Sequence, residues 1–177
     1  MGLNNLKVGR TAAWMMAQAI RLPGVMAIFV GGHRWHGHEL RETGFRSYMR
    51  ECAPHLTVLD PLVNLETRQL TYETTMGLLA RQPNLRGIYV AGGGMEGAIA
   101  ALREARPVDN IAMVVSALTP DSRAGLAEGL VTMVTDTPLE KLCRELFVAM
   151  ARVATDGPPQ GGIQHFLPPD LHVAESI

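Results

Sequence analysis

Short apolar runs and longer amphipathic stretches alternate along the chain. VMAIFV at residues 25–30 is apolar at every position, which is typical of a strand buried on both faces of a sheet. Comparable runs predict further strands at 56–63, where Pro61 interrupts the run, in the first part of 86–105, at 110–115 and at 130–135.

Apolar residues at helical spacing fill the segments between these runs. They predict helices at 6–20, 38–52, 65–82, in the second part of 86–105, in a short segment that Thr119 and Pro120 begin, and at 138–154. We expect no strand before the first helix. A Gly/Pro-rich break at 156–162 is followed by IQHF and LHVAESI, which we expect to form edge or closing strands.

This alternation predicts an α/β fold, a doubly wound and mostly parallel sheet flanked by helices. Ligands of such sheets bind beyond the carboxyl ends of the strands. In this chain those ends carry GGHRWHG, AGGG, SALTP and TDTP.

Composition narrows the possible functions. The chain has 177 residues and a formal net charge of -1, and its Lys and Arg residues form no basic stripe for nucleic acid. No apolar run is long enough to span a membrane, and no secretory signal is apparent. Cys52 and Cys143 form no CxxC pair, so we expect reduced thiols and a cytoplasmic protein.

The glycines of AGGGMEG allow two interpretations. Gly92, Gly94 and Gly97 match the spacing of a dinucleotide-binding fingerprint, but a strand-to-helix turn in any α/β fold also needs glycines. A dinucleotide site needs an acidic residue after the next strand, and that strand ends in Ser116 and Ala117. We therefore favour the turn and expect no cofactor.

The loop after the first strand is rich in histidine. His33, His36, His38 and Glu39 suggest a transition-metal site, but their spacing matches no closed zinc pattern, so we expect no metal. The chain has no GxSxG elbow, and both cysteines fall in helical segments. We expect no catalytic residue and no enzyme activity.

Trp35 and Arg41 are the strongest candidates for contacting a ligand. Trp35 is either a loop anchor packed on the sheet edge or an aromatic platform for the apolar face of a sugar-like molecule. Arg41 lies in the first turns of a helix, where a positive charge opposes the helix dipole. Either Glu39 or Glu42 compensates it in a surface salt bridge, or a ligand does so by bidentate contact.

The order of several segments resembles the effector-sensing domain of LacI-family transcription regulators, which is itself similar to periplasmic sugar-binding proteins. The segments are GRTAA, the HxxRxxGF motif, AGGGMEGAIAALRE, LTP, VTDTP and PPDLHVAESI. The resemblance covers nearly the whole chain. It implies one lobe of a periplasmic-binding-protein-like type 1 fold.

The resemblance also divides the chain. It implies that residues 1–133 form the C-terminal lobe, that 134–160 return to an N-terminal lobe absent from this chain, and that 161–177 are closing strands. Operator DNA would be bound only through a domain that this chain lacks. The 138–154 helix would then expose an apolar face unless a second copy covers it, so we expect a homodimer.

Carried over residue by residue, the resemblance implies an effector site for a sugar or sugar-like molecule. Arg41 matches the arginine that grips the effector, and Trp35 and His38 fall in the same binding loop. Three positions depart from the family pattern: Gly92-Gly93 stand where Asn-Asp is common, Ala117 replaces an acidic residue, and Asp136 replaces a glutamine. An ABC-transporter solute-binding protein and a nucleotide-binding Rossmann-like enzyme are the alternatives.

Overall fold

A computed structural model describes residues 1–32, 34–107, 110–157, 161 and 164–177. Its helices and strands follow one another as β1 (Gly2–Leu3), α1 (Asn5–Ala19), β2 (Gly24–Val30), α2 (His36–Cys52), β3 (Leu56–Val58), β4 (Leu62–Val63), α3 (Arg68–Arg81), β5 (Leu85–Val90), α4 (Met95–Ala105), β6 (Ala112–Ser116), α5 (Pro120–Ala127), β7 (Met133–Asp136), α6 (Leu139–Asp156), β8 (Phe166–Leu167), β9 (Asp170–His172) and the 3-10 helix η1 (Ala174–Ser176).

The main sheet confirms the predicted doubly wound architecture. Within the described residues its strands lie in the order β3-β2-β5-β6-β7-β9, and β4 also pairs with β2. Every pairing in this sheet is parallel except that of β7 with β9. The strand order reverses between β2 and β5, so the carboxyl ends of these two strands flank the crevice where ligands of such sheets bind.

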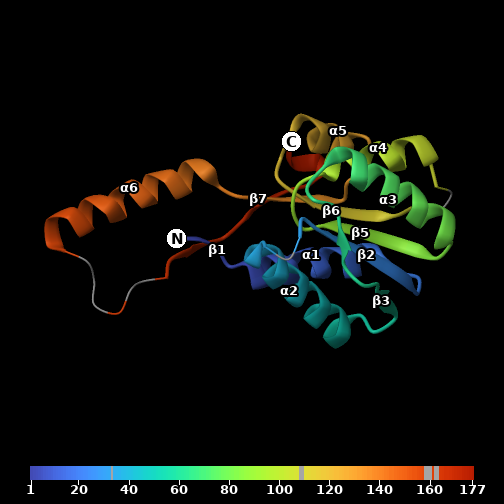
Figure 1. Ribbon diagram of the computed structural model, residues 1–177, viewed down its shortest axis with the longest axis horizontal. Helices are drawn as coiled ribbons and strands as arrows, with labels where there is room; N and C mark the ends of the chain where they lie inside the picture. Colours follow the sequence, from blue (N-terminus) through green and yellow to red (C-terminus); the bar gives the residue numbers. More distant parts are fainter. Residues whose placement is uncertain (33, 108–109, 158–160, 162–163) are drawn as a thin grey trace.

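Two helical layers cover the sheet (Figure 1). Helices α1 and α2 pack against each other, and their apolar residues join one core cluster with Met26, Ile28 and Tyr89. Helices α3, α4 and α5 enclose a second cluster with Phe29, Ile88 and other buried side chains. Because successive side chains of a strand point to opposite faces, each buried strand contributes side chains to both clusters.

Helices α1 and α2 approach each other closely through two glycines. A Cβ on Gly44 of α2 would overlap the backbone oxygen of Leu6, and one on Gly9 of α1 would overlap the backbone oxygen of Arg41. Backbone atoms of two packed helices have little room to move apart, so any larger residue forces the helices to separate. The glycine of the HxxRxxGF motif is therefore a packing residue.

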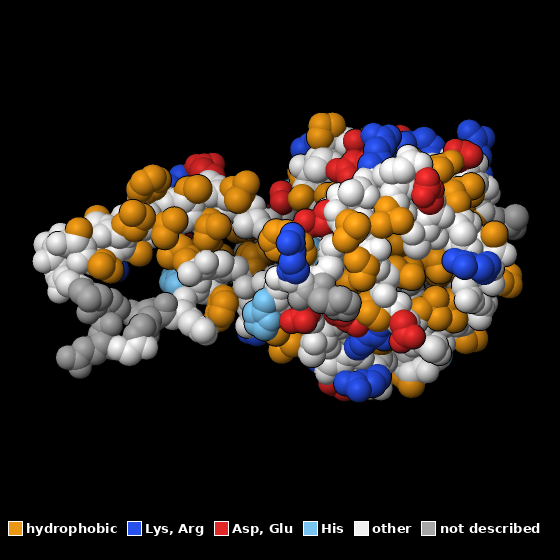
Figure 2. Space-filling model, in the orientation of Figure 1, with side chains coloured by type: hydrophobic (Ala, Val, Ile, Leu, Met, Phe, Trp, Pro, Cys, Tyr) orange, Lys and Arg blue, Asp and Glu red, His pale blue; other side chains and the backbone are white. Residues whose placement is uncertain are grey.

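Helix α6 differs from the others because it extends away from the layered body (Figure 1). None of its residues is buried, and Figure 2 shows hydrophobic side chains gathered along it. Phe147, for example, is 70% exposed. The returning chain touches this region through an ion pair of 2.8 Å between His165 Nε2 and Glu145 Oε2.

The structure corrects several boundaries. Strand β1 precedes α1, contrary to the prediction, and pairs with β8 in a separate two-stranded sheet. Helix α3 begins at Arg68 rather than at 65, because Leu65 and Glu66 have positive φ and Thr67 is the N-cap. The strand predicted at 130–135 spans Met133–Asp136.

The ends of the chain and the cysteines also differ in detail. Phe166 of the predicted IQHF strand lies in β8, Ile163 is outside the described residues, and the last residues form η1 instead of extending β9. Cys52 and Cys143 are both free and exposed. Among the described residues, no helix combines the length and the apolar content that a membrane span requires.

The α1–α2 contact predicts that Gly44→Ala destabilises the protein. Alanine normally favours a helix interior over glycine by about 1 kcal/mol, but here overlap with the Leu6 backbone reverses the sign, and we expect a loss of about 1–3 kcal/mol. Chemical denaturation measures it. The matched control is Gly77→Ala in α3, where a Cβ meets only the flexible end of Arg81. Equal effects of the two substitutions would contradict the packing role.

Candidate ligand-binding site

The predicted strand-end loops meet at one edge of the sheet. β2, β5, β6 and β7 are parallel neighbours, so the segments that follow them lie side by side at their carboxyl ends. β7 continues from this edge into α6 (Figure 1). The candidate site is therefore a surface built by several loops.

Arg41 reaches from α2 across this edge. Its Nε donates to Asn5 Oδ1 at 2.8 Å, and its Nη1 donates to the carbonyl oxygen of Ala91 at 2.7 Å and to Ser116 Oγ at 3.1 Å. These partners belong to α1, to the end of β5 and to the end of β6. The guanidinium is thus fixed in place by three elements.

The neighbouring carboxylates do not neutralise Arg41. Glu42 Oε1 is 2.7 Å from Nε of Arg46, and Glu39 Oε2 is 3.4 Å from Nδ1 of His36. Among the described residues, no ion pair joins Arg41 to an acidic side chain. Neither Glu39 nor Glu42 therefore compensates Arg41 in a surface salt bridge.

The structure places His38 in the first turn of α2 rather than in the preceding loop, and its side chain is only 13% exposed. Its Nδ1 accepts a hydrogen bond from the Gly31 backbone at 3.1 Å, so the neutral imidazole carries its proton on Nε2. Nε2 is 3.7 Å from Glu66 Oε1. Burial lowers the pKa of His38 below its ordinary value, the charge of Glu66 opposes this shift, and Arg41 adds to it.

Trp35 immediately precedes α2 and is 48% exposed. Its ring centroid is 6.1 Å from that of His38, with the ring planes tilted by 36°. An indole with half its surface exposed beside an imidazole is no core residue, and it offers an apolar face to a molecule at this edge. Its role as a platform remains a prediction.

The glycine turn after β5 is shaped by packing. Gly94 is the N-cap of α4 and has a φ of 83°, in the left-handed region, while a Cβ on Gly97 would overlap the backbone oxygen of Arg68 in α3. Gly93 N donates to Glu66 Oε1 at 3.1 Å. The spacing that resembles a dinucleotide fingerprint thus serves a turn and helix packing, and a carboxylate occupies an amide that a pyrophosphate would need.

Asp136 lies at the same edge, at the end of β7. Its Oδ1 accepts a hydrogen bond from the backbone of Thr137 at 2.8 Å. It lines a cavity of about 630 Å³ together with residues of α6 and with Asp170 and His172 of β9. Ala117, after β6, has a φ of 79° and presents no polar side chain.

The sequence prediction missed four residues of this edge: Asn5, Asn64, Glu66 and Ser116. Asn64 and Glu66 follow β4 and so occupy a fifth strand-end loop, a position that itself signals a ligand edge. Asn64 Nδ2 donates to the Gly93 carbonyl at 2.9 Å, which ties that loop to the glycine turn.

No metal centre is apparent in the part of the chain that the structure describes. It contains no group of three or more His, Cys, Asp or Glu side chains placed to hold an ion. His33, which completed the predicted cluster, lies outside the described residues. His36 is exposed and pairs with Glu39.

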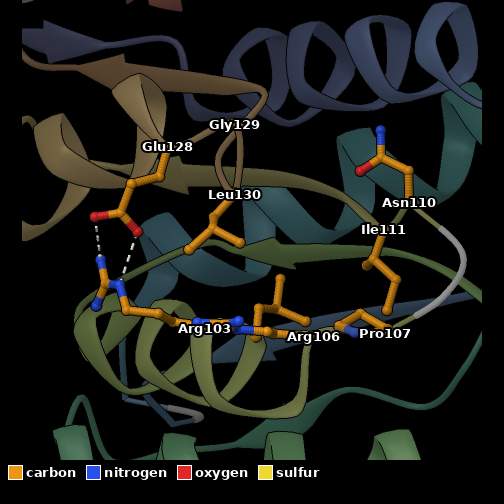
Figure 3. Close-up of a pocket in the computed structure, with 9 residues that line it drawn as sticks. Arg103, Arg106, Pro107, Asn110, Ile111, Glu128, Gly129 and Leu130 are labelled. Carbon is orange, nitrogen blue, oxygen red and sulfur yellow. Dashed lines mark hydrogen bonds and ion pairs between the residues drawn. The ribbon is translucent and has the colours of Figure 1, made fainter.

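A second pocket lies at the opposite edge of the sheet, beside the amino ends of β6 and β7. Its volume is about 330 Å³, and Arg103, Arg106, Asn110 and Glu128 are among the residues that line it (Figure 3). Arg103 and Glu128 pair with each other through two hydrogen bonds of 2.7 and 3.0 Å. None of the predicted site residues lines this pocket.

Comparisons with known protein families and solved structures agree with the fold described above. Residues 1–158 match the family described as periplasmic binding protein domain. The chain belongs to this family. No curated protein sequence matches it.

Solved structures show the same fold as this periplasmic binding protein domain. GanP, a glucose-galactose binding protein from Geobacillus stearothermophilus, has a TM-score of 0.89 at 14% identity, and the match covers 99% of this chain and 62% of GanP. An ABC transporter periplasmic solute binding protein from Actinobacillus succinogenes 130z with bound D-allose has a TM-score of 0.86 at 20% identity, covering 98% and 61%. A sugar ABC transporter (sugar-binding protein) from Bacillus halodurans has a TM-score of 0.85 at 18% identity, covering 98% and 63%. The chain spans about three fifths of the length of these proteins.

The lowered pKa of His38 predicts that this domain loses stability in mild acid. Below about pH 6.5 an unfolded histidine takes up a proton, whereas the folded domain resists protonation because His38 is partly buried. The unfolded state therefore binds more protons, and the free energy of unfolding falls as the pH decreases from 6.5 to the folded-state pKa. Urea denaturation of the wild type and of His38→Gln between pH 7.5 and 5 measures it. The variant should lose less stability over this range, and parallel curves would refute the assignment.

Proposed function

We propose that this domain binds a sugar or sugar-like small molecule at the carboxyl edge of its sheet. The observation that carries the proposal is the guanidinium of Arg41, which three elements hold in place while no carboxylate among the described residues pairs with it. A fixed guanidinium donates hydrogen bonds to ligand oxygens in a defined direction. Trp35, half exposed beside His38, supplies the apolar surface that pyranose rings stack on.

The names of the structural neighbours support this ligand class. One is a glucose-galactose binding protein and another holds D-allose. Their identity to this chain is 20% or less, so the likeness establishes the fold and the proposal depends on the residues of the edge itself. The proposal names a binding function, and the hydrogen bond from Gly93 N to Glu66 argues against a nucleotide at the glycine turn.

We propose that the chain forms part of the solute-binding protein of an ABC transporter. Two of the neighbours named above are described as ABC-transporter proteins. The second candidate is the effector domain of a LacI-type regulator, which the order of the HxxRxxGF, LTP and VTDTP segments favours. A regulator works in the cytoplasm and a transporter receptor outside it. The gene sequence preceding residue 1 separates them: a signal peptide indicates the receptor, and a helix-turn-helix indicates the regulator.

Binding is expected to depend on the shape of Arg41 as well as on its charge. Arg41→Lys keeps the charge but cannot contact Asn5, Ala91 and Ser116 together. In amide NMR titrations with D-allose, D-glucose, D-galactose and D-ribose, we expect shifts at Gly92 and Gly93 for at least one sugar. We expect about tenfold weaker binding of that sugar by the variant, the effect of losing one hydrogen bond to a charged group.

A second arginine variant and two nucleotides serve as controls for the sugar titration. Arg81→Lys changes an exposed arginine at the end of α3 whose Nε donates to the Gly77 carbonyl, and it should bind like the wild type. NAD and ATP should produce no shifts. Binding of a nucleotide, or the absence of shifts with every sugar, would count against the proposed function.

We also propose that the chain forms a homodimer through the apolar face of α6. Large side chains stand exposed along one helix, and exposed apolar surface of this kind favours association. They are Leu139, Leu146, Phe147, Val148, Met150 and Val153.

Sedimentation velocity should show a dimer for the wild type and a shift toward monomer for Phe147→Asp. Thr155→Asp, which adds the same charge at another exposed position of α6, should leave the dimer intact. A monomeric wild type would refute this surface as a dimer interface.

A further inference from the structure

Gly92 and Gly93, in the turn after β5, have no side chains, yet side chains of other segments lie against them. A Cβ on Gly92 would overlap Cε1 of His38 and would lie 3.0 Å from Oε1 of Glu66. The same carboxylate oxygen accepts from Gly93 N at 3.1 Å. The space that side chains at these two positions would take is therefore filled by an imidazole from the first turn of α2 and a carboxylate from the loop between β4 and α3.

The loop between β4 and α3 is built to hold Glu66 in this place. Asn64 is fully buried, and its Oδ1 accepts from the Glu66 backbone at 3.0 Å while its Nδ2 donates to Gly93 O at 2.9 Å and to Thr71 Oγ1 at 3.0 Å. Leu65 and Glu66 have φ values of 50° and 57°. Consecutive non-glycine residues in the left-handed region are uncommon, and such strain concentrates at functional sites.

Beside the glycine turn, one positive and one negative side chain stand near a histidine. Arg41 is positive and Glu66 is negative, while His38, with its pKa lowered by burial, is neutral at pH 7 and carries its proton on Nε2. Glu66 uses Oε1 for both of its contacts, and Oε2 has no hydrogen-bond partner among the described residues. The edge therefore offers a fixed donor, an imidazole N–H and a free carboxylate oxygen, which accepts hydrogen bonds from hydroxyl groups.

We propose that Glu66 and His38 are the specificity-determining residues of this site and take over the polar contacts that the glycine turn cannot make. This inference depends on the proposed function. Glu66 accepts from ligand hydroxyls and repels a ligand carboxylate, so the site selects a neutral polyhydroxylated ring over the corresponding sugar acid. Gly92 and Gly93 are small because these two side chains occupy their surroundings.

The decisive experiment compares neutral sugars with their acids on the whole 177-residue chain. Amide NMR titrations use D-glucose with D-glucuronate, D-galactose with D-galacturonate, and D-allose. For the wild type, we expect at least tenfold tighter binding of the neutral partner. Glu66→Gln keeps the shape and the hydrogen bond to Gly93 but removes the charge. We expect it to weaken neutral-sugar binding about tenfold and to abolish the discrimination against the uronate.

The possible outcomes distinguish a failure of this inference from a failure of the proposed sugar-binding function. Glu73→Gln removes an exposed carboxylate of α3 that accepts a hydrogen bond from Gln69, and it should leave both affinities unchanged. A wild type that binds sugar, together with a Glu66→Gln variant of unchanged affinity and selectivity, overturns the inference and leaves the proposed function standing. A wild type that binds none of the sugars overturns both.

A second measurement needs no ligand. Gly92→Ala should lower the melting temperature because its Cβ collides with the His38 ring, and adding His38→Ala should restore much of the loss. If the double variant melts no higher than Gly92→Ala, the His38 ring does not fill the space beside Gly92. Gly77→Ala serves as the control for a glycine substitution that meets only a flexible side chain.

Discussion

The close contact between α1 and α2 is the constraint on which the rest of the site depends. Gly9 and Gly44 let each helix rest on the backbone of the other, and Gly9 does so directly against Arg41. This brings Asn5, in the first turn of α1, within 2.8 Å of the Arg41 guanidinium. From there the same group reaches the carbonyl of Ala91. Helix packing, rather than a local charge pair, thus sets where the positive charge of the site lies.

The polar groups of the edge come from segments that are distant in sequence, and the sheet topology explains why they meet. The strand order reverses between β2 and β5, so the segment after β2 carries His38 to the side of the crevice opposite the glycine turn. The loop after β4, which pairs with the end of β2, brings Glu66 to the same place. The turn after β5 has no side chains and leaves room for both, so polar groups reach this part of the edge from other segments.

Some elements and site residues could be predicted from the sequence and others could not. Buried strands such as VMAIFV at 25–30 were predictable because burial on both faces leaves a continuous apolar run. Strand β1 was not, since a two-residue strand has no periodicity. Arg41 stood out by its unfavourable position in a helix, but Glu66 did not. Its role arises from a contact with Gly93 and from a positive φ, and neither follows from residue type or spacing.

The edge that carries Arg41 also leads into α6, so the surface proposed to bind a ligand and the helix proposed to associate meet at one junction. β7 pairs with β6 in register up to Ser116 and Thr135, so Asp136 follows directly at the ligand edge, and α6 begins three residues later. The cavity beside Asp136 is lined from both sides of this junction. Leu139, the first of the exposed apolar residues of α6, lines the same cavity. Coupling between the two proposed binding events requires that this junction have two arrangements and that a ligand at Asp136 favour one of them, because a ligand shifts an equilibrium only through its differential affinity for the two states.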